Sequence, residues 1–370
     1  MKILIIGGTG VLSYDFTQKV INCGHEVYLL NRGKTSLDFM DKCKFISADI
    51  RQDEIEVLKR KLSVGIYDVV VDFLSYDSVQ VEKTLKVLEN CYTKYVFIST
   101  ALVYGEGQKK QKIDENTQVK RGIWEYADKK IDAENYVVDK VKDYLIIRPY
   151  ITYGNSRIPY QMAPDKYYYT LIKRIIDERP IPLLEGGGAL CNLTHTIDFA
   201  NILYRLIVSE NAHREIYNVV SDDVVSWKEI YDTICSQLNV CPNLFSLSYE
   251  EVKKYLPEYY YSLKCGKGEE YVVSGKKAEN EIGGYQCSVT KEEGISKSLK
   301  YYLDNPEHQG VDYRWDGRMD YAYRRSKHKI CKLVPTKGNK DKSTNLFAYY
   351  FMQSILLRKI YRLLKRSIYE

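Results

Sequence analysis

The first half of the chain alternates short apolar runs with longer segments in which apolar residues recur every three or four positions. Short runs of this kind are typical of strands that are buried on both faces of a sheet. They fall at residues 2–6, 26–31, 44–48, 68–73, 95–100 and 144–148. Val81, Leu85 and Leu88 share one face of a helix expected between two of these strands. This alternation predicts an α/β fold over residues 1–150, with a doubly wound parallel sheet of the Rossmann type.

The regular alternation ends after Pro149, where Tyr, Pro and Gly become frequent. We expect residues 151–310 to form a smaller substrate-binding domain that is interleaved with the first. Residues 311–344 are polar and basic and are expected to be a linker. Residues 345–370 are expected to form one appended amphipathic basic helix.

Composition and charge exclude several classes of protein. The chain has nine cysteines without a Cys-x-x-Cys pair and five histidines without metal-ligand spacing, so we expect neither a disulfide framework nor a metal site. This cysteine usage indicates a cytoplasmic protein. Residues 311–370 hold 15 Lys and Arg against 5 Asp and Glu, whereas the first 310 residues hold 40 against 44. A mildly acidic body argues against nucleic-acid binding.

The basic C-terminal segment has two interpretations. Its apolar residues, Phe347 and Phe351 among them, oppose a basic set that includes Arg358, Lys359 and Arg362. One interpretation is packing onto the body or onto the partner of a homodimer. The other is adsorption to anionic lipid at a membrane surface, as a peripheral contact.

A glycine-rich turn follows the first expected strand. Gly7, Gly8 and Gly10 come directly after residues 2–6 and open a helix, with Ser13 where a third glycine is usual. Glycines there let backbone N–H groups approach a pyrophosphate at the helix N-terminus. The position of this turn inside a repeating strand–helix pattern predicts a dinucleotide site.

The second expected strand ends at Asn31-Arg32, where dinucleotide folds place the residue that contacts the ribose. An acidic residue there would repel a 2′-phosphate. Asn31 removes that repulsion, and Arg32 adds a planar cation suited to phosphate. We therefore expect NAD(P) as the cofactor, with NADP favoured over NAD. Asp49, just past the third strand, is a candidate acceptor for the adenine amino group.

A Tyr-x-x-x-Lys spacing places both side chains on one helical face. The ammonium group then favours the tyrosine phenolate, which a general base requires. Among several occurrences, Tyr126 and Lys130 alone lie between two expected strands with room for a full helix before the second. They follow Ser99-Thr100, at the end of the preceding strand, after a loop long enough to fold back over a cofactor.

Further motifs appear in a fixed order. They are Gly7-Gly-Thr-Gly10, Phe97-Ile-Ser-Thr-Ala-Leu-Val-Tyr-Gly105, Tyr126-x-x-x-Lys130 with Ala133-Glu134, Ile147-Arg148-Pro149, His195-Thr-Ile-Asp198 and Tyr217-Asn-Val. On these motifs the chain resembles the extended short-chain dehydrogenase/reductase superfamily, and within it the NAD-dependent epimerase/dehydratase family. The resemblance covers residues 1 to about 305.

This resemblance implies Thr100 as the catalytic hydroxyl, Tyr126 as the acid/base and Lys130 as the ribose-binding lysine. It implies dinucleotide contacts from Gly7, Thr9, Gly10, Val11, Leu12, Asn31, Arg32, Asp49, Ile50, Phe73, Leu74, Ser99, Lys130 and Tyr150. Candidate substrate contacts are Leu102, Arg157, Cys191, Lys264 and Lys267.

Departures from the family pattern narrow the activity. Dehydratases carry an Asp-Glu pair where this chain has Ala101-Leu102, so we do not expect dehydration. Galactose-type epimerases contact the substrate diphosphate with residues replaced here by Ile151 and Cys191. We expect an NAD(P)-dependent oxidoreductase or epimerase acting on a sugar, foremost a nucleotide sugar. The alternatives are an NADPH-dependent keto-sugar reductase and a non-catalytic dinucleotide-sensing or interaction protein.

Overall fold

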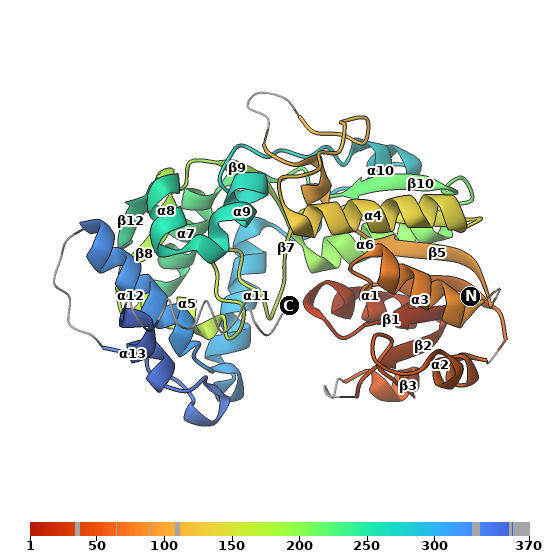
Figure 1. The fold of residues 1–370 in the computed structure, drawn as a ribbon, viewed down its shortest axis with the longest axis horizontal. Coiled ribbons are helices and arrows are strands. Elements are labelled where there is room, and N and C mark those ends of the chain that lie inside the picture. The colour runs from red at the N-terminus through yellow and green to blue at the C-terminus, as the bar shows by residue number, and fades with distance from the viewer. Residues whose placement is uncertain are drawn as a thin grey trace. The chain divides into compact units, whose positions relative to one another are not determined.

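The computed structural model describes residues 1–33, 38–63, 65–89, 91–107, 112–327, 334–354 and 357. The chain divides into two compact units (Figure 1). Unit 1 comprises residues 1–154, 191–224 and 270–290, and unit 2 comprises residues 155–190, 225–269 and 291–370. Both units are therefore built from separate segments of the chain.

Unit 1 is built on a seven-stranded sheet with the strand order β10-β6-β5-β4-β1-β2-β3. The strands of this sheet pair in parallel with their neighbours. Its strands are β1 (Lys2–Ile6), β2 (Glu26–Asn31), β3 (Lys44–Ser47), β4 (Tyr67–Asp72), β5 (Tyr92–Ile98), β6 (Tyr144–Pro149) and β10 (Glu215–Val219). The six strands expected from the sequence are present; half of their ends match the expected residues, and the other half shift by one to three residues. The seventh, β10, comes from far beyond residue 150, the expected boundary of this domain.

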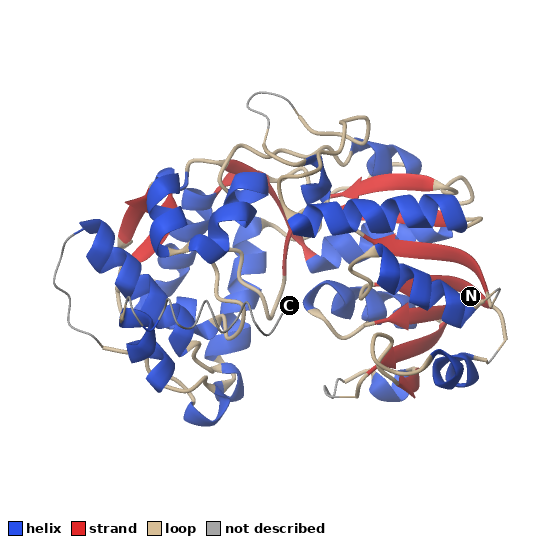
Figure 2. Ribbon diagram, in the orientation of Figure 1, coloured by secondary structure: helices blue, strands red, loops and turns tan. Residues whose placement is uncertain are grey.

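Helices cover both faces of this sheet (Figure 2). Because successive side chains of a strand point to opposite faces, Ile3 and Ile5 enter one apolar cluster, and Leu4 and Ile6 enter the other. The first cluster includes residues of α1 and α6, and the second includes residues of α2, α3 and α4. The helices of unit 1 are α1 (Val11–Asn22), α2 (Ile55–Leu62), α3 (Ser78–Leu88), α4 (Glu125–Lys140), α6 (Thr196–Val208) and α10 (Lys276–Glu281).

Two short strands complete the first unit. β7 (Ile151–Tyr153) pairs in parallel with β9 (Leu190–His195), and the register places Tyr153 opposite His195. His195 then caps α6, because its Nδ1 accepts a hydrogen bond from the backbone N–H of Ile197 at 3.2 Å. The His-Thr-Ile-Asp motif therefore begins a helix in this structure.

Unit 2 is mainly helical, with the parallel pair β8 (Ile181–Leu184) and β12 (Leu244–Leu247). Its other described elements are α5 (Tyr169–Ile176), α7 (Trp227–Leu238), α8 (Tyr249–Tyr255), α9 (Tyr260–Ser262), α11 (Lys291–Leu303), α12 (Tyr313–Lys327) and α13 (Phe347–Gln353). The short strand β11 (Val224–Ser226) leads from unit 1 into α7.

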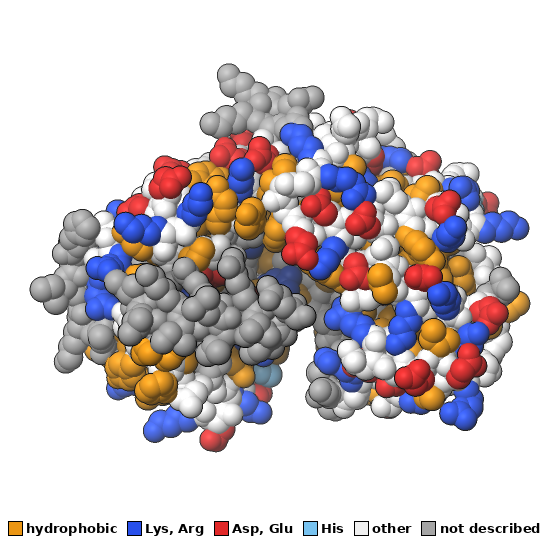
Figure 3. Space-filling model, in the orientation of Figure 1, with side chains coloured by type: hydrophobic (Ala, Val, Ile, Leu, Met, Phe, Trp, Pro, Cys, Tyr) orange, Lys and Arg blue, Asp and Glu red, His pale blue; other side chains and the backbone are white. Residues whose placement is uncertain are grey.

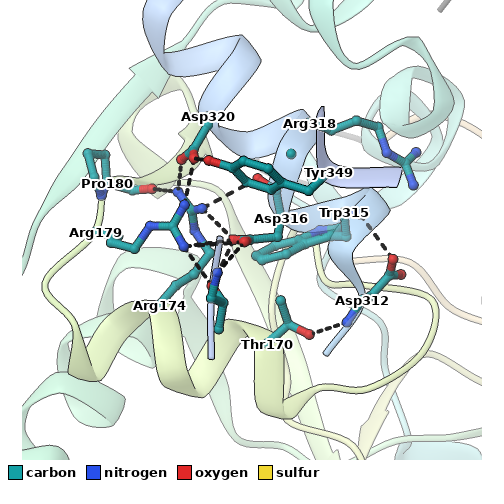
Figure 4. A network of polar contacts seen from close by, with 12 residues as sticks. Thr170, Arg174, Arg179, Pro180, Asp312, Trp315, Asp316, Arg318, Asp320 and Tyr349 are labelled. Atoms are coloured by element: carbon teal, nitrogen blue, oxygen red, sulfur yellow. Dashed lines mark hydrogen bonds and ion pairs between the residues drawn. The ribbon is translucent and has the colours of Figure 1, made fainter. Parts of the chain in front are cut away.

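A buried network of charges joins α5 to α12 (Figure 4). Arg174, which is fully buried, contacts Asp316 at 2.6 Å and Asp320 at 2.9 Å. Arg179 contacts the same two carboxylates, and Tyr349 of α13 donates its hydroxyl to Asp320. Each of the two buried carboxylates therefore has cationic and hydrogen-bonding partners, which buried charges require.

The C-terminal expectations need correction. Residues 311–344 are not a linker throughout, because α12 lies within them and buries Trp315 and Met319. Residues 345–370 are not one helix, because α13 ends at Gln353 and Ser354 is extended. Residues 355, 356 and 358–370 lie outside the described part of the chain.

Candidate dinucleotide and catalytic site

The glycine-rich turn closes tightly between β1 and α1. Gly7 has φ +86° and donates its N–H to the carbonyl of Leu30 at 2.9 Å. A Cβ atom at Gly7 would lie 2.4 Å from Cγ of Leu74, so the position requires glycine for both conformation and space. Ser13 donates its hydroxyl to the carbonyl of Gly7 at 2.7 Å and accepts the N–H of Gly10 at 2.9 Å. The serine that replaces the third glycine thus ties the turn together.

A pocket of about 410 Å³ opens beside this turn, within the usual size range of small-molecule sites. Its lining includes eight of the predicted dinucleotide contacts, namely Gly7, Thr9, Gly10, Asn31, Arg32, Asp49, Ile50 and Leu74. Ala48, Arg51 and Gln52 also line the pocket and were not predicted. Arg51 donates a hydrogen bond to the carbonyl of Leu74. The signal that could have found it is its place two residues after Asp49, on the loop that follows β3.

Asn31 presents an unused donor in this pocket. Its Oδ1 accepts the N–H of Gly33 at 2.8 Å, while its buried Nδ2 has no hydrogen-bond partner among the described residues. Buried polar atoms are nearly always satisfied, so such an atom in the wall of a pocket indicates a ligand acceptor. Together with the N-terminus of α1, which the glycine turn places beside the pocket, this donor fits the polar part of a dinucleotide.

Lys130 lies on α4, and its buried side chain joins the carboxyl ends of two neighbouring strands. Its Nζ donates hydrogen bonds of 2.9 Å each to the carbonyls of Ser75, just past β4, and Ile98, at the end of β5. Burial lowers the pKa of Lys130 to about 8. Ammonium carries three N–H donors, so the two carbonyls leave one donor for another acceptor. In parallel α/β sheets, ligands bind at this edge of the strands.

Tyr126 lies one helical turn before Lys130, on the first turn of α4. Its ring is flanked by those of Trp124 and Tyr76, with centroids 4.9 and 5.4 Å away. Tyr76 follows Ser75 on the loop that Lys130 holds. These aromatic contacts fix the ring of Tyr126 over the loop that follows β4, and Tyr126 remains only partly buried.

The residues at the end of β5 are held by hydrogen bonds. Ser99 is buried and donates its hydroxyl to Oε1 of Glu134 at 2.5 Å. Thr100 begins a short 3₁₀ turn, Ala101–Tyr104, and its Oγ1 accepts the N–H of Leu102 at 3.2 Å. Ser99 and Thr100 therefore lie at the carboxyl edge of β5, as predicted, and Ile98, the last residue of β5, contacts Lys130.

A buried polar chain extends from Glu134 across unit 1. Arg148, at the end of β6, binds Glu134 through two hydrogen bonds of 2.9 and 2.5 Å. Arg148 also donates to the hydroxyl of Tyr104, which donates to Oδ1 of Asn218 on β10, both at 2.8 Å. These four residues belong to the motifs noted in the sequence, and the structure joins those motifs in one hydrogen-bonded chain.

The remaining predicted dinucleotide contacts lie outside the pocket lining. Val11 and Leu12 begin α1. The ring of Phe73 lies 5.7 Å from that of Phe16, on the edge of the apolar core. Tyr150 is buried and stacks on Tyr271 with centroids 4.8 Å apart.

The predicted substrate contacts are divided between the two units. Leu102 and the fully buried Cys191 belong to unit 1. The backbone of Cys191 forms an isolated parallel β-bridge with that of Tyr271. Arg157, Lys264 and Lys267 belong to unit 2. Arg157 is hydrogen-bonded to Tyr168, and Lys267 lies over the ring of Trp227 at 5.9 Å.

The described residues offer neither a membrane span nor a metal site. No helix among them is long and apolar enough to span a bilayer. Within the same residues, no group of three or more His, Cys, Asp or Glu side chains is arranged to hold a metal ion.

Comparisons with solved structures give the same architecture. The dTDP-glucose 4,6-dehydratase of Bacillus anthracis, in complex with NAD, matches with a TM-score of 0.66 and 18% identity. That alignment covers 83% of this chain and 98% of the other. The UDP-glucuronic acid 4-epimerase of Bacillus cereus, also in complex with NAD, matches with a TM-score of 0.64 and 17% identity, over 81% and 98%.

Curated relatives and a family model extend the comparison to sequence. The chain is 25% identical over 325 residues to a chloroplast stem-loop binding protein of 41 kDa from Arabidopsis thaliana, covering 82% of this chain and 79% of the relative. It is 24% identical over 215 residues to the dTDP-glucose 4,6-dehydratase of Neisseria meningitidis, covering 57% and 58%. The model of the NAD dependent epimerase/dehydratase family matches residues 3–219, more than half of the chain. The resemblance seen in the sequence is thereby confirmed, and the chain belongs to the NAD dependent epimerase/dehydratase family.

Proposed function

We propose that this protein is an NAD(P)-dependent oxidoreductase or epimerase that transfers hydride at a carbinol carbon of a sugar, foremost a nucleotide sugar. The observation that carries the proposal is the placement of Lys130. It lies one helical turn from Tyr126, bridges the ends of β4 and β5 and retains one N–H donor for a ligand. This position lies at the edge of the sheet where parallel α/β folds bind their ligands.

The residues of the pocket beside the glycine turn fit the adenosine and pyrophosphate part of NAD(P). Backbone N–H groups of the turn would hold the pyrophosphate, and the unpartnered Nδ2 of Asn31 would bind near the ribose. Arg32 and Arg51 both line the pocket and supply planar cations for a 2′-phosphate, so we favour NADP over NAD. When bound, the nicotinamide supplies the hydride acceptor or donor.

The chain's own residues accept and return the proton of the substrate. In oxidation, the substrate hydroxyl transfers its proton to Oη of Tyr126; in reduction, Tyr126 returns a proton to the carbonyl oxygen. The Lys130 ammonium favours the phenolate form by charge. Thr100 orients the substrate oxygen, and Ser99 holds the end of β5 through Glu134.

The substrate class follows from the family and from one departure. One similar protein is in complex with UDP-glucuronic acid and NAD, and another is a UDP-glucuronic acid 4-epimerase in complex with NAD, which supports a nucleotide sugar here. Ala101 and Leu102 provide no acid or base after Thr100, so elimination of water is not proposed. A net NADPH-dependent keto-sugar reductase remains the alternative activity, because the same residues serve it.

Mass spectrometry of small molecules released by denaturing the purified protein tests the proposal. Retained NAD(P)⁺ would support an internal redox cycle, as an epimerase requires, and empty protein that binds NADPH would support the reductase. The Arg32→Ala variant should bind NADPH more weakly by about 1–3 kcal/mol and NADH almost unchanged. Protein that neither retains nor binds any dinucleotide would overturn the proposal.

A second candidate comes from the stem-loop binding relative, which aligns over 82% of this chain. It is a non-catalytic role in which the protein binds a nucleic-acid stem-loop. The mildly acidic residues 1–310 argue against it, and the basic residues 311–370 argue for it. Binding of a hairpin RNA, with a salt dependence that tracks several phosphate contacts and without turnover of any sugar, would favour this candidate.

A further inference from the structure

Charged side chains usually lie at the surface, and Figure 3 shows Asp and Glu interspersed with Lys and Arg over unit 1. Asp72, the last residue of β4, is by contrast fully buried. Its Oδ1 accepts the backbone N–H groups of Leu74 at 2.8 Å and Ser75 at 2.9 Å. Its Oδ2 accepts the hydroxyls of Ser75 at 2.5 Å and Tyr95 at 2.6 Å. All four groups donate, which matches an ionised carboxylate, and all four are neutral, so none of them supplies a counter-charge.

Ser75 joins this carboxylate to Lys130. Its N–H and hydroxyl are both donated to Asp72, while its carbonyl accepts Nζ of Lys130 at 2.9 Å. The carboxylate therefore fixes, through one residue, a carbonyl that holds the ammonium group. On the neighbouring strand β5, the carbonyl of Ile98 holds Lys130, and the hydroxyl of Tyr95 holds Asp72. One buried cation and one buried anion are thus tied to the same two strands.

The charges around Lys130 differ in how far they favour its ammonium form. Burial lowers the pKa of Lys130 to about 8, and the negative charge of Asp72 is the strongest of those that raise it. Three further charged side chains act on Lys130, namely Glu134 of α4, Arg51 after β3 and Asp77 before α3. Glu134 also favours the ammonium form, but its charge is shared with Arg148, to which it is bound by two hydrogen bonds. Asp72 therefore supplies the largest counter-charge that Lys130 has among the described residues.

We propose that Asp72 is a positioning residue, which keeps Lys130 in the ammonium form and holds it in place through Ser75. This rests on the proposed function, in which the ammonium group favours the phenolate of Tyr126. Without the carboxylate, the buried amine would lose its proton at lower pH, and Tyr126 would lose the adjacent positive charge. Asp72 is fully buried and acts only through Lys130. It thereby sets the pH above which proton transfer by Tyr126 slows.

Nuclear magnetic resonance of the full-length protein, with lysine labelled with ¹³C at Cε, tests this proposal without any substrate. The signal of Lys130 is assigned by its absence from Lys130→Met, and its change with pH gives the titration midpoint. In Asp72→Asn the midpoint should fall by about 1 pH unit relative to the wild type, because an attractive charge is removed. The asparagine has the shape of the aspartate, accepts the two N–H groups through Oδ1 and donates to the two hydroxyl oxygens through Nδ2, so the fold should persist.

Tyr95→Phe is the matched control, since it removes one hydrogen bond from the same carboxylate and keeps the charge. Urea unfolding should show that both variants are less stable, but the midpoint of Lys130 should stay at its wild-type value in Tyr95→Phe. If Asp72→Asn does not fold, Asp72→Asn/Lys130→Met should regain the fold, because the two charges are removed together. An unchanged midpoint in Asp72→Asn, an equal fall in Tyr95→Phe, or loss of the fold in both Asp72 variants would overturn the proposal.

The pH dependence of kcat separates this proposal from the proposed function. On a sugar that the wild type turns over, the alkaline limb of kcat should move to lower pH in Asp72→Asn by the same amount as the midpoint of Lys130. A shifted midpoint in a protein that turns over no sugar would support the coupling of Asp72 to Lys130 and contradict the proposed function. Turnover with an alkaline limb and a midpoint that Asp72→Asn leaves unchanged would support the proposed function and overturn the role of Asp72.

Discussion

Glu134 and Arg148 form a buried ion pair in which the carboxylate accepts two hydrogen bonds from the guanidinium, at 2.9 and 2.5 Å. Both side chains are 5% exposed. Glu134 lies one turn after Lys130 on α4, and Arg148 lies at the end of β6. The pair therefore fixes the helix of the proposed acid/base against the sheet edge where the substrate would react.

Replacing Glu134 with Gln should destabilise the protein by about 3 kcal/mol, because it leaves the buried Arg148 without its counter-charge. Urea unfolding measures this. Glu125→Gln on the same helix is the control, since its partner Lys129 is solvent-exposed and such pairs are worth about 0–1 kcal/mol. Equal shifts of the two midpoints would show that the buried pair contributes no more than a surface one.

Gly7→Ala should abolish dinucleotide binding, because the new methyl group would collide with Leu74 in the pocket wall. Gly24→Ala is a matched control. Gly24 also has positive φ, at +77°, but has open space around it, so only a conformational cost of about 1 kcal/mol is expected. Titration of NADPH against both variants distinguishes steric blockage from general strain, and undiminished binding by Gly7→Ala would place the dinucleotide elsewhere.

Because the pKa of Lys130 is lowered in the folded state, the free energy of unfolding should rise with pH. Burial lowers its pKa to about 8, whereas the unfolded lysine titrates near 10.4. Between these values the unfolded chain binds more protons, so this group makes the folded state more stable as pH rises, by roughly 3 kcal/mol across the window. The free energy of unfolding of Lys130→Met should lack this rise when compared with the wild type at pH 8 and pH 10. Parallel curves for the two proteins would mean that burial does not lower the pKa of Lys130.

The charged network around Asp316 should contribute strongly to the stability of unit 2. Asp316→Asn removes a fully buried charge that faces Arg174 and Arg179, and should cost about 3–5 kcal/mol. Asp232→Asn removes the partner of Lys228 in an exposed pair and should cost about 0–1 kcal/mol. Melting curves of both variants measure the difference, and a small effect of Asp316→Asn would mean that α12 docks without this network.

The sheet and the glycine-rich turn could be predicted from the sequence because their signals are local. Runs such as Ile3–Ile6 are buried on both faces, and Gly7 follows one of them directly. Tyr126 could be selected among many tyrosines by its distance from the neighbouring strands. Arg51 was not predicted, although it lies only two residues after Asp49, because its contact with Leu74 joins two loops that the sequence does not relate.

The sequence predicts a linker at residues 311–344, where the structure has α12, because charged residues are usually typical of solvent-exposed segments. Asp316 and Asp320 suggest exposure when considered alone, and only the pairing with Arg174, about 140 residues earlier, makes their burial favourable. The sequence likewise does not predict the end of α13 at Gln353, because the apolar periodicity continues through Ser354. Long-range partners decide both features.

The turnover of Tyr126→Phe shows whether Tyr126 is the general acid/base. The substitution removes the proton acceptor but keeps the ring between Trp124 and Tyr76, so folding and dinucleotide binding should persist. Redox turnover of a nucleotide sugar should fall by about 10²–10⁴-fold, the usual contribution of a general acid/base. Tyr136→Phe, two turns and more along the same helix, should leave turnover unchanged. Near-normal turnover of Tyr126→Phe would show that Tyr126 is not the general acid/base.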